Sequence, residues 1–135
     1  MFNILEVAEE YNFDVIPWDA DDPTVQAATL NLNGNYAVFI NYGAIGTNAE
    51  ATVIEAHETG HCITGGLHRL SSPYELIEKN EYKADYAAAK LTVDPEELRA
   101  QLKRDENLFR VAQHFGVTAG FLARVIYIYQ RKQLL

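Results

Sequence analysis

Cysteine is almost absent from this chain. Cys62 is the single cysteine among 135 residues, so no intrachain disulfide can form, and such usage is typical of a reducing compartment. No apolar run approaches the roughly 20 residues that a membrane-spanning helix needs. The N-terminal residues lack a basic segment and turn acidic at Glu6, unlike a secretory signal peptide. We therefore expect a cytoplasmic protein that does not contact a membrane.

Basic residues are also scarce. The chain has 11 Lys and Arg against 19 Asp and Glu, and its net charge of −8 argues against a general nucleic-acid binder. Residues 95–135 hold seven Lys and Arg against four Asp and Glu, or +3, which leaves −11 on residues 1–94. With 48% hydrophobic and 22% charged residues, a chain of this length suits one globular domain.

Hydrophobic spacing predicts an α+β fold with a small sheet near the N-terminus. A short amphipathic helix over residues 2–11 is followed by a brief strand over 15–18. Residues 26–41 are typical of a β-hairpin whose two-residue turn is Asn33-Gly34.

Helical signals dominate the rest of the chain. A capping box, Thr47-x-x-Glu50, opens one helix, which Gly65-Gly66 closes. A second capping box with proline at the first helical position, Ser72-Pro73-Tyr74-Glu75, opens a helix that runs to about Thr92. Further helices are predicted from Asp94-Pro95, over about 106–114, and over about 119–132.

The motif His57-Glu58-Thr59-Gly60-His61 lies inside the first of these long helices. Residues four apart lie on the same helical face, so the two imidazoles can bind one ion, as two of the three protein ligands of a catalytic zinc do. Glu58 would then stand beside the ion, where a carboxylate can act as a general base on water. The competing interpretation is an exposed helical face or a hydrogen-bonded pair at the edge of the core. The capping box, the glycines and a downstream ligand favour the metal site.

A third ligand is predicted on the following helix. Glu78, Glu81 and Asp85 share one helical face, and three such carboxylates are either a solvated stripe or face a cation. Apolar residues on the next turns indicate that this helix is partly buried, and buried carboxylates need a metal or hydrogen-bond donors. In the pattern Glu81-x-x-x-Asp85, Glu81 is the third ligand and Asp85 accepts the free N–H of a ligand histidine, which fixes its tautomer.

Two rivals remain for the third position. Glu78 is the weaker candidate because Tyr82, not an acid, follows it four residues later. A three-histidine site would need histidine at Leu67 and glycine at Thr64, whereas His68 and Gly65 each come one residue late.

Taken together, these motifs resemble the ImmA/IrrE family of small zinc metallopeptidases, whose pattern is approximately H-E-L-G-H followed by E-x-E-A-N/D-x-F-A-x-x-L-L-x-P. The likeness covers about residues 25–130. The chain departs from the pattern at Lys83, where a second Glu is common, at Ala87, where Phe is common, and at Asp94-Pro95, which ends the helix one residue late.

The resemblance implies a zincin-like, gluzincin-type fold: a small antiparallel-rich sheet packed on the helix with the two histidines and on a helix bearing Glu81. It implies a single domain over 1–135, with a catalytic core over 1–94 and a helical C-terminal extension over 95–135 packed on it. Members are encoded by bacteria, prophages and other mobile elements, and they act on helix-turn-helix repressors to relieve repression.

Our leading hypothesis is a zinc endopeptidase that binds one Zn²⁺ per chain through His57, His61 and Glu81. Glu58 would be the catalytic base, and Asp85 would accept a hydrogen bond from a ligand histidine. The substrate would be a helix-turn-helix repressor. The alternative is an antirepressor that binds without cleaving and carries a structural or vestigial zinc. The pure binder has no need for Glu58.

Two further expectations concern the surface. The spacing of Ala112, Gly116 and Leu122 suits a helix-turn-helix, but the second helix is too apolar to read DNA, and we favour an ordinary packed pair of helices. We also expect residues 35–41 to form an edge strand beside the cleft, able to pair with an extended substrate. The alternative is that this strand already pairs with residues 15–18.

Overall fold

The structure is a computed structural model that describes residues 1–65 and 74–135. His68 and the predicted capping box at Ser72-Pro73 lie outside these residues. The described part is α+β, as predicted, and its helices and strands are α1 (Ile4–Tyr11), β1 (Asp14–Pro17), β2 (Ala27–Leu32), β3 (Asn35–Ile40), α2 (Asn48–Thr64), α3 (Tyr74–Thr92), α4 (Pro95–Arg104), α5 (Leu108–Phe115) and α6 (Ala119–Arg131), with a 3₁₀ turn at Tyr42–Ala44.

The predicted hairpin is confirmed. Strands β2 and β3 pair antiparallel from Ala27 opposite Ile40 to Leu32 opposite Asn35. Between them Asn33 and Gly34 have φ values of 55° and 91°, the left-handed region that a two-residue hairpin turn requires and that Asn and Gly tolerate best.

The sheet is mixed, with the strand order β1-β3-β2. Strand β1 pairs parallel with β3, from Asp14 opposite Ala37 to Pro17 opposite Ile40. Our expectation that residues 35–41 form an edge strand is therefore wrong, because β3 is the central strand and has a partner on each side. The physical reason is burial: Val38 and Ile40 are fully buried, and a central position gives the backbone N–H and C=O groups of such a strand hydrogen-bond partners on both sides. Of the two edge strands, β2 is the one in closer contact with α2, the helix that carries His57 and His61.

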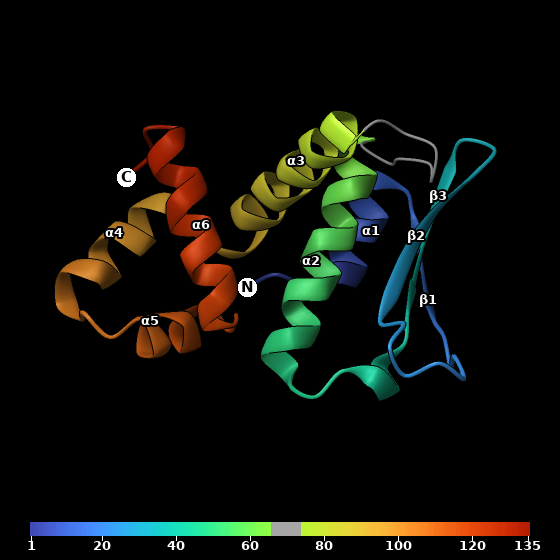
Figure 1. The fold of residues 1–135 in the computed structure, drawn as a ribbon, viewed down its shortest axis with the longest axis horizontal. Coiled ribbons are helices and arrows are strands. Elements are labelled where there is room, and N and C mark those ends of the chain that lie inside the picture. The colour runs from blue at the N-terminus through green and yellow to red at the C-terminus, as the bar shows by residue number, and fades with distance from the viewer. Residues whose placement is uncertain (66–73) are drawn as a thin grey trace.

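Helix α2 lies between the sheet and the other long helices and contacts α1, β2, β3 and α3 (Figure 1). The Thr47 hydroxyl accepts the Glu50 backbone N–H at its start, and Gly65 ends it with φ 67°, as the capping signals predict. Helices α4, α5 and α6 stand on the other side of α3, away from the sheet (Figure 1).

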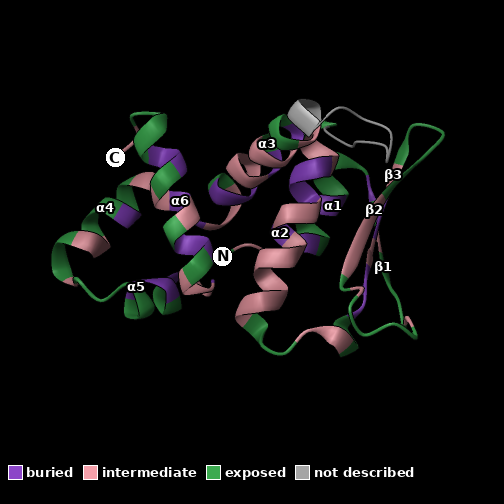
Figure 2. Cartoon of the chain, in the orientation of Figure 1, coloured by how far each residue is buried: buried purple, intermediate pink, exposed green. Residues whose placement is uncertain are grey.

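Buried apolar residues form two clusters. Figure 2 shows how far each residue along the helices and strands is buried. The smaller cluster joins α1 to the sheet, and the larger joins α2 and α3 to the C-terminal helices. Phe2 packs against both clusters. In α6, Leu122, Val125 and Ile128 are fully buried, which is the behaviour expected of a packed helix pair.

Helices α5 and α6 meet at 91°. Within the described residues, no single helix is long and apolar enough to cross a membrane; this bent pair meets that criterion on length and composition together.

Candidate metal centre

The two histidines of the motif lie side by side on α2. Their rings are 4.8 Å apart between centroids and nearly perpendicular, at 88°. His61 is buried, with 5% of its surface exposed, whereas His57 keeps a quarter of its side chain accessible. One face of α2 therefore presents two imidazoles, one held in the interior and one at the rim of a cavity.

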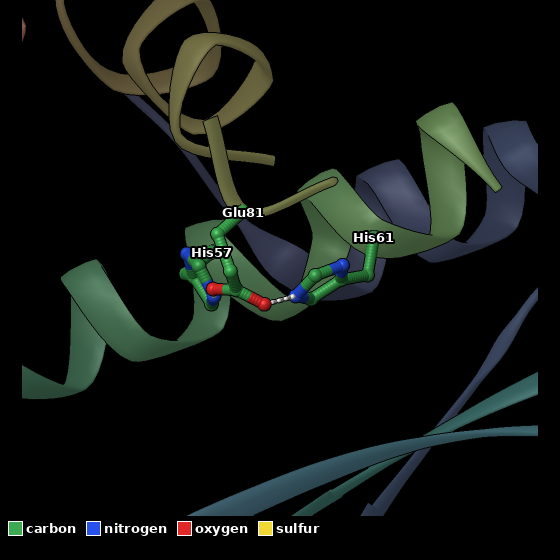
Figure 3. A group of neighbouring side chains, drawn as sticks. All are labelled: His57, His61 and Glu81. Carbon is green, nitrogen blue, oxygen red and sulfur yellow. Dashed lines mark ion pairs between the residues drawn. The ribbon is translucent and has the colours of Figure 1, made fainter. Parts of the chain in front are cut away.

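Glu81 approaches both rings from α3. One carboxylate oxygen lies 3.0 Å from Nε2 of His57 and the other lies 3.1 Å from Nε2 of His61 (Figure 3). One ligand atom from each of the three side chains falls within 4.8 Å of the others. Two imidazole nitrogens and one carboxylate form the donor set of many catalytic zinc sites, and their convergence on one point fits a single divalent cation. The three predicted ligands are therefore together.

Small residues allow α2 and α3 to approach this closely. Ala56 and Gly60 on α2 and Ala84 and Ala88 on α3 are all buried, and the two alanines Ala56 and Ala88 belong to the same apolar cluster. Gly60 lies directly against the Ala84 backbone. The close approach lets a side chain as short as that of Glu81 reach both imidazoles.

Asp85 lies one turn after Glu81, and its Oδ1 is 2.9 Å from Nδ1 of His57. The Nδ1–H of His57 can thus donate to Asp85 while Nε2 faces Glu81, which is the predicted orientation. Burial acts to lower the pKa of His57, but the hydrogen bond and charge of Asp85, with the charge of Glu81, raise that pKa overall. Burial likewise acts to raise the pKa of Asp85, and hydrogen bonds and charges from His57 and Arg124 lower it overall. Asp85 therefore stays a carboxylate that can accept the N–H.

Glu58 stands beside this group and is held by a residue that the sequence did not indicate. The hydroxyl of Thr29 on β2 donates to Oε2 of Glu58. Glu58 and His57 line an open cavity of about 350 Å³, with Ala27 of β2 and Val53 of α2 among its other walls. The carboxylate is therefore fixed at a cavity large enough for a segment of another molecule.

Neither alternative to Glu81 as the third ligand is supported by the described residues. Glu78 is exposed, and it is not part of the group that could share an ion. His68, the centre of the three-histidine alternative, lies outside the described residues, as does Leu67. Cys62 packs against the smaller apolar cluster, and burial, with the charge of Glu58, raises the pKa of its thiol to about 12. Cys62 is not part of the group that could share an ion.

Two residues that bond to the side chains of this site, Thr29 and Arg124, lie far from their partners in the sequence. Local sequence patterns do not reveal them. Thr29 precedes Glu58 by 29 residues, and Arg124, whose Nε lies 3.2 Å from Oδ2 of Asp85, follows Asp85 by 39 residues. The alternation of β2 would place Thr29 on a defined face, but which face turns toward α2 depends on the whole sheet.

Comparison with protein-family models, with curated proteins and with solved structures finds no match for this chain.

Proposed function

We propose that this chain is a zinc-dependent endopeptidase with a zincin-like fold, related to the ImmA/IrrE metallopeptidases that its motifs resemble. One observation carries the proposal: His57, His61 and Glu81 converge on one point while Glu58 is fixed beside them at an open cavity. A structural zinc site is closed by four protein ligands, whereas a catalytic site has three and keeps a position for water, beside which Glu58 would stand.

Each residue has a role that follows from its position. His57, His61 and Glu81 would hold the ion, and Asp85 orients His57. Bound Zn²⁺ supplies Lewis acidity, which polarises a peptide carbonyl and makes water a better acid. Glu58 takes a proton from the attacking water and then gives it to the departing amine, so the C–N bond breaks as the amine becomes neutral. Thr29 holds the Glu58 carboxylate in place for both transfers.

The resemblance supports a helix-turn-helix repressor of a phage or mobile element as the protein substrate, and cleavage would relieve repression. The cavity beside β2 suits a polypeptide, since one of its walls is an edge strand to which an extended segment can pair.

A single substitution tests this proposal against the non-cleaving antirepressor. Glu58→Gln removes the base and keeps the ligands, so zinc should stay bound while cleavage falls by about 10²–10⁴-fold. The purified chain and the variant are each mixed with the repressor encoded nearest to the gene, with and without a chelator, and fragments are sought by mass spectrometry.

The same pair is then tested for derepression in cells. Derepression that survives Glu58→Gln undiminished, with an intact repressor, would replace the peptidase by the antirepressor.

A further inference from the structure

Asp85 is held from two sides. Its Oδ1 is 2.9 Å from Nδ1 of His57, and its Oδ2 is 3.2 Å from Nε of Arg124. The three side chains come from α3, α2 and α6, so a connected series of polar contacts runs from the C-terminal helix to a proposed metal ligand. Because each oxygen has its own partner, the carboxylate cannot rotate without losing one of these contacts.

Arg124 lies over two aromatic rings and keeps 40% of its side chain exposed. Its guanidinium carbon lies 5.6 Å from the centre of the Tyr82 ring and 5.4 Å from that of Tyr127, distances at which a cation and an aromatic face attract each other. The next residue, Val125, is fully buried in the larger apolar cluster. Further along α6, the Tyr129 hydroxyl donates to the Val93 carbonyl oxygen at 2.6 Å, which ties the helix to the end of α3. The position of the guanidinium therefore follows from the packing of α6.

The charge of Arg124 matters because of where Asp85 lies. Only 21% of the Asp85 side chain is exposed, so water alone solvates it poorly. A neighbouring cation compensates for that burial, and an arginine hydrogen bond also sets the direction of the carboxylate.

We infer that Arg124 is a positioning residue of the metal site, which acts through Asp85 to hold the His57 imidazole with Nε2 toward Glu81. The inference rests on the proposed metal site and adds that α6, in the C-terminal extension, completes it. Loss of a partner behind a ligand typically weakens metal binding by about 10–100-fold. Arg124 contacts Asp85 and not the ligand itself, so the effect of removing it should lie near the lower end of this range. We expect zinc binding to weaken about tenfold.

The test measures Zn²⁺ affinity by competition with a chromophoric chelator, for the full chain and for the variants Arg124→Met, Arg124→Lys, Asp85→Asn and the Asp85→Asn/Arg124→Met double. Arg131→Met is the matched control. Arg131 also lies over the Tyr127 ring, at 5.7 Å, and its hydrogen bond goes to the Tyr127 hydroxyl at 3.1 Å. The thermal unfolding of each metal-free variant is followed in parallel, so that a loss of folding is seen separately.

We expect about tenfold weaker zinc binding for Arg124→Met, near-normal binding for Arg124→Lys and for Arg131→Met, and a double variant no weaker than Asp85→Asn alone. That last result is the signature of action through Asp85. The Co²⁺-loaded chain should also show an altered visible spectrum in Arg124→Met and an unaltered one in Arg131→Met.

Normal zinc binding by a folded Arg124→Met, or an effect that adds fully to that of Asp85→Asn, would overturn the role of Arg124. A wild-type chain that does not bind zinc would instead overturn the proposed function, so the two failures are distinguishable.

Discussion

A Cβ atom on residue 60 would lie 2.3 Å from the carbonyl oxygen of Ala84. No unstrained structure contains such a contact, and the atom it meets is backbone, which cannot rotate away. Gly60 is thus a point of very close approach between α2 and α3, three residues from His57 and next to His61. The glycine of the motif sets the distance between the two helices and, with it, the reach of Glu81.

The variant Gly60→Ala tests this relationship. In an exposed helix the change would stabilise by up to about 1 kcal/mol, because alanine is the better helix former. Here the forced separation of α2 and α3 should win and destabilise by about 1–3 kcal/mol. Urea unfolding of the metal-free chain shows whether the variant is less or more stable than the wild type. Zinc affinity should fall as well, since Glu81 moves away with α3. A more stable variant with normal zinc affinity would contradict the packing described here.

Loss of the third ligand is the second test. Glu81→Ala should remove most of the zinc that purifies with the chain, which wild type should carry at close to one ion per molecule, as measured by elemental analysis. Glu78→Ala is the matched control, because Glu78 lies one turn earlier on α3 and is exposed. It should retain normal zinc. The assignment of Glu81 is wrong if its variant keeps the ion while Glu78→Ala or His68→Ala loses it.

The third test concerns the Thr29 hydroxyl. Thr29→Val removes the donor to Glu58 but keeps the shape and the preference for a strand. A hydrogen bond to a charged group contributes about 1.5–3 kcal/mol to stability, so Thr29→Val should unfold more easily by up to that amount while its zinc content stays normal. Because the bond orients the proposed base, kcat should fall by about 10-fold or more. Thr29→Ser keeps a hydroxyl and should recover most of the activity. Equal rates for the valine and serine variants would show that Glu58 does not depend on this bond.

Local signals explain which parts of this structure could be predicted from the sequence. The turn at Asn33-Gly34, the cap at Thr47 and the end at Gly65 each depend on a few neighbouring residues, and all three are found where expected. The common face of His57 and His61 likewise follows from helical geometry alone. Predicting Glu81 as the third ligand required only that the next helix pack against that face.

The features that the sequence left open, such as the pairing of residues 15–18 with 35–41 that was our alternative, and those that it missed are all long-range. The parallel pairing of β1 with β3 joins residues more than 20 positions apart, and nothing in Asp14–Pro17 specifies which side of the hairpin it joins. The hydrogen bond from Thr29 to Glu58 depends on how the sheet packs against α2. The contact of Arg124 with Asp85 depends on how α6 packs against α3. Periodicity identifies the face of an element, but only the packed fold identifies what that face meets.

The corrected sheet order moves the predicted substrate strand from β3 to β2. The backbone N–H of Asn41 donates to the Gln26 carbonyl at 2.8 Å, so the peptide groups of Gln26 and, by alternation, Ala28 face β3. Those of Ala27 and Thr29 face the other edge, which in the described part of the chain has no strand partner. Ala27 also lines the cavity beside Glu58. An extended substrate segment could therefore add to the sheet as a fourth strand at this edge.

The last prediction compares prolines at two adjacent positions of β2. Ala27→Pro removes an N–H that faces the open edge, so the sheet should keep its own hydrogen bonds, and zinc content and unfolding should stay normal. Substrate should bind less tightly, with KM raised by about 5–10-fold for the loss of one hydrogen bond of about 1 kcal/mol. Ala28→Pro instead removes a donor to β3 and should destabilise the hairpin itself, which identifies the two edges independently. A folded, zinc-loaded Ala27→Pro that cleaves with the wild-type KM would exclude pairing at β2 and place the substrate on the α2 side of the cavity, against Val53.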